Sequence, residues 1–261
     1  MKKLYFMYMG SAKAIRNLAW KVHKKIQSSL RPTFINVNGY SMFLDKGDST
    51  GYSTKEYEKD TTELIKNNIK EGDVVIDLGA NIGYYTLLMA KLVGKNGRVF
   101  AFEPEPKNLE LLKRNIQLNT LKNITVIEKA VSNKVGEDNL YIDKKYIGSH
   151  TLYNEFTDKK PIKVEVTTID KFFEDYKGKI NFIKMDIEGS EYRALEGMSD
   201  LIIKNNVKLI IEYATSRIIE NGNTPNEFMS LIKSLGFKHK LIIDNNNPMV
   251  GNLFCYKNQG K

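Results

Sequence analysis

The chain has 261 residues, of which 41% are hydrophobic and 27% are charged, with 18 glycines and 6 prolines. This is the composition of a globular protein with one large domain, and it excludes collagenous, disordered and low-complexity chains. The 40 basic and 31 acidic side chains leave a net charge of +9, which attracts nucleic acid, anionic lipid or an acidic substrate without selecting one.

The number of cysteines and the length of the apolar runs indicate the cellular compartment. The single cysteine, Cys255, cannot form an internal disulfide, which fits a reducing compartment, so we expect a cytoplasmic protein. No apolar run approaches the roughly 18 residues that a membrane-spanning helix requires. The sequence carries no signal for the oligomeric state.

Residues 1–33 are predicted to form a basic amphipathic helical extension. Ile15, Leu18 and Val22 recur at helical spacing, and lysines occupy the other faces. The apolar stripe can pack on the main domain, or the helix can lie on an anionic membrane surface and give the protein peripheral membrane contact. A short apolar stretch, residues 4–9, is at the lower length limit for a secretory signal.

Residues 34–70 are predicted to hold a small β hairpin and a helix that leads into the main domain. The Asn38-Gly39 dipeptide between two short alternating segments suits the positive φ angles of a tight turn. An apolar stripe predicts a helix over residues 60–69, which Glu71-Gly72-Asp73 ends.

Residues 71–261 are predicted to form a single α/β domain, because β-branched segments alternate with helical ones. Strands are predicted over 74–78, 98–102, 124–128, 180–185 and 207–212, and helices over 84–93, 107–118, 190–203 and 225–235. Apolar strands joined by helices indicate a mainly parallel sheet with helices on both faces. Strands over 238–243 and 252–256 should complete seven strands, with an antiparallel C-terminal strand at the edge.

The residues after the first two strands carry the strongest functional signal, since ligands of doubly wound sheets bind beyond the strands' carboxyl ends. Gly79 and Gly83 permit a tight turn and present backbone amides at a helix start. Glu103 follows the second strand, 24 residues after Gly79, near the spacing at which an acidic side chain binds ribose hydroxyls. Asp77 before the loop would repel the pyrophosphate of nicotinamide or flavin cofactors. The loop resembles motif one of the class I S-adenosylmethionine-dependent methyltransferases.

Four motifs in order resemble the FkbM family of methyltransferases. They are Asp77 to Thr86, Phe102-Glu-Pro-Glu-Pro with the Arg114-Asn115 helix, Ala130-Val131-Ser132, and Lys184-Met-Asp-Ile-Glu-Gly-Ser-Glu191. The resemblance covers about residues 55 to 215. It implies the class I Rossmann-like fold, S-adenosylmethionine as cofactor, and methyl transfer to a hydroxyl or carboxylate oxygen on a sugar of a glycan or on a small natural product.

The same resemblance assigns the cofactor contacts. Asp77, Gly79 and Asn81 should hold the methionine end, and the backbone amides from Gly79 to Gly83 should face its carboxylate. Glu103 should bind the ribose. Glu58 matches an acidic position near the cofactor, although a solvated glutamate at a helix start explains it equally. The complete predicted set is Glu58, Asp77, Gly79, Ala80, Asn81, Gly83, Glu103, Pro104, Ala130, Val131 and Asp186, with Ala130 and Val131 beside the adenine.

The catalytic candidates follow the fourth strand. Strand alternation predicts that Lys184, Asp186 and Glu188 share one face, although a buried ion network that merely shapes the loop is the alternative. Methyl transfer needs an aligned acceptor whose proton is removed as the new bond forms. Asp186 is the first candidate for the base or acceptor positioner, and Glu188 is the second. Lys184 could orient an acidic acceptor, and His150 lies in a polar segment predicted to fold over the acceptor.

A metal and two other functions are weighed against this hypothesis. Asp186 and Glu212 could supply two Mg²⁺ ligands, but no third is visible, so no obligatory metal is predicted. The charge of +9 favours an RNA-directed methyltransferase, whereas Asp186-Ile-Glu-Gly189 lacks the Pro-Pro-aromatic pattern of base-directed enzymes, so nucleic acid is not the expected partner. A membrane-docked binding protein without turnover is the third function, which the intact glycine loop disfavours.

Overall fold

The structure is a computed structural model that describes residues 32–46, 48–53, 57–143, 148–153, 160–244 and 247–257. The predicted helical extension falls on residues that lie, apart from its last two, outside these ranges, so packing and membrane contact both stay open. Within the described ranges, no helix has the length and the apolar character needed to span a membrane.

The predicted hairpin and leading helix are both present. Strands β1 (Phe34–Val37) and β2 (Tyr40–Phe43) pair antiparallel, and the Asn38-Gly39 turn has φ angles of 53° and 78°. These positive angles are the ones that a two-residue hairpin turn requires. Helix α2 (Lys59–Asn68) begins one residue earlier than predicted.

Seven strands form the central sheet in the order β11-β12-β10-β9-β3-β4-β5. The strands are β3 (Val74–Leu78), β4 (Arg98–Phe102), β5 (Ile124–Ile127), β9 (Phe182–Met185), β10 (Lys208–Ala214), β11 (Lys238–Asp244) and β12 (Asn247–Tyr256). The five from β5 to β10 are parallel, so their carboxyl ends share one edge. The chain runs outward from β3 to β5 and then returns to β9 on the other side of β3. This switch point is where doubly wound sheets bind ligands.

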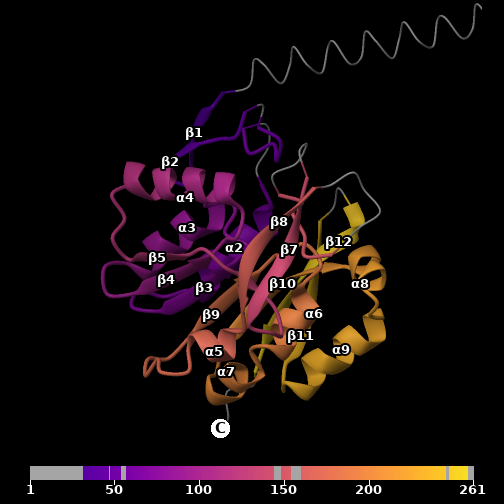
Figure 1. Ribbon diagram of the computed structural model, residues 1–261. Coiled ribbons are helices and arrows are strands. Elements are labelled where there is room, and N and C mark those ends of the chain that lie inside the picture. The colour runs from indigo at the N-terminus through magenta and orange to yellow at the C-terminus, as the bar shows by residue number, and fades with distance from the viewer. Residues whose placement is uncertain are drawn as a thin grey trace, which may run out of the picture.

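Helices cover both faces of the central sheet (Figure 1). Alternate strand residues face one helical layer or the other. Val75, Val99 and Phe182 belong to the layer that contains α2 and α3, whereas Ile76 and Ile183 face the opposite layer. The first layer contains α2, α3 (Tyr84–Val93) and α4 (Pro106–Leu118); the second contains α5 (Ile169–Phe172), α6 (Glu191–Glu196), α7 (Ser199–Lys204), α8 (Thr215–Glu220) and α9 (Pro225–Ser234). The predicted α/β fold is therefore confirmed.

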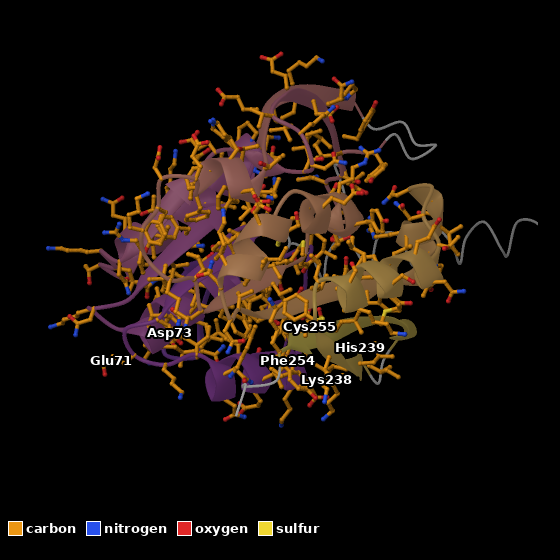
Figure 2. All side chains as sticks on the ribbon, turned by 90° about the horizontal axis from the view of Figure 1, so that it is seen from below. Glu71, Asp73, Lys238, His239, Phe254 and Cys255 are labelled. Atoms are coloured by element: carbon orange, nitrogen blue, oxygen red, sulfur yellow. The ribbon has the colours of Figure 1, made fainter. Side chains whose placement is uncertain are left out.

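The antiparallel strand lies one position further inside the sheet than predicted. β12 is inserted between β10 and β11, so β11 is the edge strand. Figure 2 shows Lys238 and His239 of β11 beside Phe254 and Cys255 of β12. Cys255 is fully buried, as suits a strand paired on both sides, whereas Lys238 is exposed, and lysines protect an edge strand from unwanted pairing.

The single helix predicted over residues 190–203 is wrong, because the chain forms α6 and α7 with a break at Gly197. A Cβ atom on Gly197 would lie 2.2 Å from the carbonyl oxygen of Ser132, so only glycine permits this approach. Asp170 then accepts hydrogen bonds from the amides of Asp200 and Leu201, at 3.1 and 2.7 Å. These bonds satisfy amides in the first turn of α7, which therefore begins as a new helix.

A second sheet was not predicted. It contains β6 (Ala130–Val131), β7 (Gly136–Ile142) and β8 (Lys160–Thr167) in the order β6-β8-β7. Leu140 packs in its small apolar core. This sheet brings residues from the long segment between β5 and β9 to the carboxyl edge of the central sheet.

Candidate active site

Two adjoining cavities open near the carboxyl ends of β3, β4 and β9. We call them the slot, of about 60 Å³, and the chamber, of about 290 Å³. The slot is lined by residues that include Phe102, Glu103, Pro104, Ala130, Val131, Leu140, His150 and Leu152. The chamber has a more polar lining, which includes Ser49, Thr50, Tyr52, Tyr57, Asp77, Ala80, Tyr84, Tyr85 and Lys184. Both cavities share Gly79, Asn81, Gly148, Asp186 and Glu188.

Gly79 fixes the distance between the end of β3 and the loop after β9. Its φ is +81°, and a Cβ atom there would lie 1.9 Å from the carbonyl oxygen of Asp186. Any side chain would push the two strand ends apart, so the glycine is needed for both its φ and its size. This close approach places Asp186 where the slot and the chamber meet.

The backbone amides of the glycine loop are used within the protein. Gly79 and Ala80 donate to the Phe102 carbonyl, Asn81 donates to the Glu103 carboxylate, and Gly83 donates to the Ala80 carbonyl. The amide of Ile82 donates to Asn81 Oδ1. These bonds bind the loop to the end of β4, so they shape the slot. To bind the cofactor's carboxylate as predicted, each of these amides would have to donate to a second acceptor as well.

Glu103 lies at the predicted position, buried at the end of β4. Its Oε2 accepts from the Asn81 amide at 2.8 Å, and its Oε1 accepts from the Glu105 amide at 2.9 Å. Burial raises the pKa of Glu103 to about 7, although both amide donors oppose this shift. A carboxylate has about four acceptor sites, so ribose hydroxyls can still donate to it.

Asp77 and Lys184 form the charged centre of the site. They are direct neighbours in the register of β3 and β9 and point to the same face, where both are buried. Asp77 Oδ2 accepts from the Thr86 hydroxyl at 2.5 Å, whereas Asp77 Oδ1 is buried and accepts no hydrogen bond from the described residues. Burial raises the pKa of Asp77, and Lys184 and Thr86 oppose the shift.

Lys184 is surrounded by carboxylates. Its Nζ lies 3.0 Å from Asp186 Oδ2 and 4.9 Å from the centre of the Tyr85 ring. Burial by itself lowers the pKa of Lys184, but Asp186, Asp77 and Glu58 together outweigh it and raise the pKa. The lysine therefore stays charged and holds the Asp186 side chain at the boundary of the two cavities.

Glu188 departs from the predicted alternation because β9 ends at Met185. Glu188 has a φ of +55°, which turns its side chain towards α8, and its carboxylate lies 2.5 Å from the Arg217 guanidinium. It therefore does not continue the face shared by Lys184 and Asp186. Burial and Asp186 raise the pKa of Glu188, and Arg217 opposes them.

Glu58 and a cluster of tyrosines support the chamber from behind. Glu58 Oε2 accepts from the Tyr85 hydroxyl at 2.9 Å and lies 3.5 Å from the Asn252 amide nitrogen. Burial and Asp186 raise the pKa of Glu58, whereas Lys184 and Tyr85 lower it. Glu58 is therefore bound into the site through Tyr85 instead of being a solvated helix-start residue.

His150 lies in the slot and not among the residues that line the chamber. Its Nδ1 accepts from the Asp143 amide at 3.1 Å, and Leu140 and Leu152 line the same cavity. Ala130 and Val131 are buried in β6 and line the slot as predicted. The slot is therefore the more apolar of the two cavities, which suits a flat base. The catalytic role of His150 stays a prediction.

The predicted metal ligands lie near one another without forming a metal centre. Glu212 Oε2 is buried and has no hydrogen-bond partner among the described residues, and burial together with Asp186 and Glu188 raises the pKa of Glu212. Within the same ranges, no group of three His, Cys, Asp or Glu side chains is arranged to hold a metal ion. Whether a metal assists the reaction stays a prediction.

The family model of the FkbM methyltransferase domain matches residues 77–239 of the sequence, which is more than half of the chain. The chain belongs to the FkbM methyltransferase family. Two curated relatives are Methyltransferase 1 of Beauveria bassiana, 23% identical over 146 residues (48% of this chain, 58% of that protein), and methyltransferase sdnD of Sordaria araneosa, 26% identical over 164 residues (51% and 63%). The chain spans less than two thirds of the length of these relatives.

Solved structures share the fold of this FkbM-family chain. A precorrin-6y C5,15-methyltransferase of Geobacter metallireducens matches with a TM-score of 0.50 and 10% identity, over 87% of this chain and 100% of that one. A Streptococcus mutans protein in complex with SAH matches with a TM-score of 0.50 and 12% identity, over 79% and 98%. The family match identifies residues 77–239 as a methyltransferase domain of the FkbM family, on a fold shared with these structures.

The residues of the site fit S-adenosylmethionine. This cofactor carries a sulfonium and an ammonium group, and the site has more carboxylates than cations. The buried Asp77 Oδ1, to which no described residue donates, could accept from the ammonium group, and Glu103 could accept from the ribose. When bound, the cofactor supplies an electrophilic methyl group. The apolar slot, which Val131 and Leu140 help to line, would hold its adenine.

Sequence reasoning missed several residues of the cleft. The missed residues are Ser49, Thr50, Tyr52, Tyr57, Tyr84 and Tyr85 in the chamber, Leu140 and Leu152 in the slot, and Arg217 on α8. The pair Tyr84-Tyr85 follows the glycine loop directly, and this position was a usable signal. Arg217 offered none, because its role depends on the φ of Glu188.

Proposed function

We propose that this protein transfers the methyl group of S-adenosylmethionine to an oxygen atom, and that the acceptor is a sugar of a glycan or a small natural product. The position of Asp186 supports the proposal most directly. Its side chain lines both the slot and the chamber and is held by Lys184 at 3.0 Å. A carboxylate at this boundary is next to both the methyl group and an acceptor in the chamber.

The proposed role of each residue follows from its contacts. Asp77 and Glu103 bind the cofactor, and Lys184 orients Asp186. The acceptor oxygen forms the new bond to the methyl carbon while the carbon–sulfur bond breaks and leaves its electron pair on sulfur. Asp186 receives the hydroxyl proton as this happens. A positioned general base of this kind contributes roughly 10²- to 10⁴-fold to the rate.

Replacing Asp186 tests the role directly. We expect D186N to lower kcat by about 100-fold or more, since the amide cannot take the proton. Calorimetry should show that SAH binds within about threefold of the wild-type affinity, because Asp77 and Glu103 still hold it. Lost SAH binding in a folded D186N protein would assign Asp186 to the cofactor and refute the role of base.

An RNA acceptor is the second candidate, which the net charge of +9 favours. The carboxylates of Asp77, Asp186 and Glu188 in the cleft weigh against it, since they repel phosphate. Filter binding separates the two acceptors. Tight RNA binding that weakens steeply with salt would favour nucleic acid, and little binding would favour a glycan or small molecule.

A further inference from the structure

One wall of the chamber comes from residues outside the cofactor-binding set that the sequence predicts. Ser49, Thr50 and Tyr52 form this wall together with Tyr57, opposite the strand ends. All four precede residue 77, where the match to the family domain begins. The chamber therefore combines strand ends from the shared domain with a wall from a segment outside the match.

The loop from residue 48 to residue 53 is held together by the buried side chain of Asp48. Asp48 is fully buried, its Oδ1 accepts from the Tyr52 amide at 2.9 Å, and its Oδ2 accepts from the Ser53 amide and hydroxyl at 2.9 and 2.6 Å. A buried carboxylate with three donors fixes the backbone on both sides of Tyr52. The loop therefore presents its side chains to the chamber in a defined arrangement before any ligand binds.

The tyrosines tie this loop to the family domain. The Tyr52 ring stacks on the Tyr84 ring, with centroids 5.1 Å apart and an interplanar angle of 7°. The Tyr52 and Tyr57 rings pack edge to face, with centroids 4.6 Å apart. Tyr84 is the first residue of α3, directly after the glycine loop. The chamber thus has a rigid wall that offers aromatic carbon and hydroxyl groups side by side, which suits a ligand with an apolar ring face and hydroxyl groups.

The charges of the chamber disfavour an anionic acceptor. Among the described residues that line it, Lys184 is the single cation, and it is already paired with Asp186. Asp77 and Glu188 add two further carboxylates, of which Asp77 faces Lys184 and Glu188 is paired with Arg217 on α8. A carboxylate or phosphate on the acceptor would be repelled here, whereas a hydroxyl or an ammonium group would be accommodated.

We propose that the loop from residue 48 to residue 53, together with Tyr57, is the acceptor-binding element, and that it binds an uncharged or amine-bearing polyhydroxylated ring. We expect uronic acids and sugar phosphates to be poor acceptors, because Lys184, the single cation among the described lining residues, is already paired. The inference rests on the proposed function and deepens it. The ring's apolar face contacts the tyrosines, its hydroxyls contact Ser49 and Thr50, and the reacting hydroxyl faces Asp186.

The first experiment uses the full chain, S-adenosylmethionine with a radiolabelled methyl group, and four matched oligosaccharides: a neutral hexose, its amino-sugar, its uronic-acid and its phosphorylated counterparts. Labelled products are treated with mild alkali, which cleaves methyl esters but leaves methyl ethers intact. We expect alkali-stable label on the neutral or amino sugar, at least tenfold above the uronic acid and the phosphate. Preferred labelling of the uronic acid or the phosphate would overturn the inference and leave oxygen-directed sugar methylation standing. Label on none of the four, with SAH still bound, would overturn the proposed sugar acceptor and this inference together.

The second experiment tests the loop itself. S49A, T50V and Y52F remove hydroxyl groups from the wall while Asp48 keeps the loop backbone in place. We expect each variant to raise KM for the preferred sugar at least threefold, while the Kd of SAH stays within twofold. S234A is the control, since Ser234 is exposed on α9 and bonds to its own helix. If KM is unchanged in all three loop variants, the wall has another role. The same conclusion follows if the affinity for SAH falls by the same factor by which KM rises.

Discussion

The slot and the chamber are built in different ways although they share an edge. The slot is formed around the ends of consecutive strands, and backbone hydrogen bonds from Gly79, Ala80 and Asn81 hold it together. The chamber depends on side chains from the loop around Asp48, from α3 and from β9, which lie far apart in the sequence. The side of the slot at β3 and β4 is therefore fixed by local geometry, whereas the chamber and the side of the slot at Leu140 and Leu152 are fixed by tertiary packing.

The largest effect is expected from closing the gap on which both cavities depend. G79A places a Cβ atom 1.9 Å from the Asp186 carbonyl oxygen at a φ of +81°, so we expect a loss of about 3 kcal/mol of stability and no detectable SAH binding. Urea unfolding and calorimetry measure both quantities.

Gly72 provides the matched control for this variant. Its φ is +86°, yet a Cβ atom there would meet nothing within 4 Å, so G72A should cost only about 1 kcal/mol of backbone strain. Equal losses of stability in the two variants would mean that strain, and not the contact with Asp186, makes Gly79 necessary.

The next effect should come from Asp77. D77N keeps the shape of the side chain but removes the charge that faces Lys184 and the cofactor's ammonium group. We expect SAH affinity to fall by about 1–3 kcal/mol, from the loss of a charge-assisted hydrogen bond. Calorimetry measures the change, and D200N on the exposed surface of α7 is the control. A D77N protein that binds SAH as the wild type does would remove Asp77 from the cofactor site.

A pH titration tests the slot without disturbing the chamber wall. The pKa of Glu103 is about 7 in the ligand-free protein, and ribose hydroxyls donate to the ionised form, so lowering the pH through 7 protonates the carboxylate and weakens binding. We expect SAH affinity to fall about tenfold between pH 8 and pH 6. E103Q should bind weakly at both pH values. A pH dependence that persists in E103Q would point to another group, such as Glu191.

The smallest effect is expected where Tyr85 connects the tyrosine cluster with Glu58. Y85F removes the hydroxyl that donates to Glu58 at 2.9 Å, which should lower stability by about 1 kcal/mol in urea unfolding. Y256F, near the end of β12, is the control. An unchanged free energy of unfolding would show that the other donors around Glu58 suffice to satisfy it.

The difference between the two cavities also explains what could be predicted. The bounds of β3, β4 and α3 coincide with the sequence prediction, because continuous apolar runs and flanking glycines depend on local geometry. Asp77 and Glu103 were placed at this sheet edge for the same reason, since Asp77 lies in the last two residues of β3 and Glu103 directly follows β4. The predicted grouping of Lys184 with Asp186 was also correct, because one strand end carries both.

The features that were missed depend on contacts between distant residues. The break at Gly197 depends on a carbonyl of Ser132, and the turn of Glu188 depends on Arg217. The chamber wall depends on hydrogen bonds to the buried Asp48 side chain, and no periodic pattern in the sequence predicts such bonds. Local patterns predict which residues approach a sheet edge, but not which other segments meet them there.

The inner position of β12 has a consequence for how the protein is made. During synthesis on the ribosome, β10 and β11 emerge before β12; β10 can pair with β9, but β11 has no neighbouring strand until residues 247–256 have followed. The same strand carries Asn252, whose amide approaches Glu58 near the opposite end of the chain. Nascent chains should therefore remain without methyl-donor affinity until β12 has emerged, and stalled products that lack β12 should be targets for proteolysis.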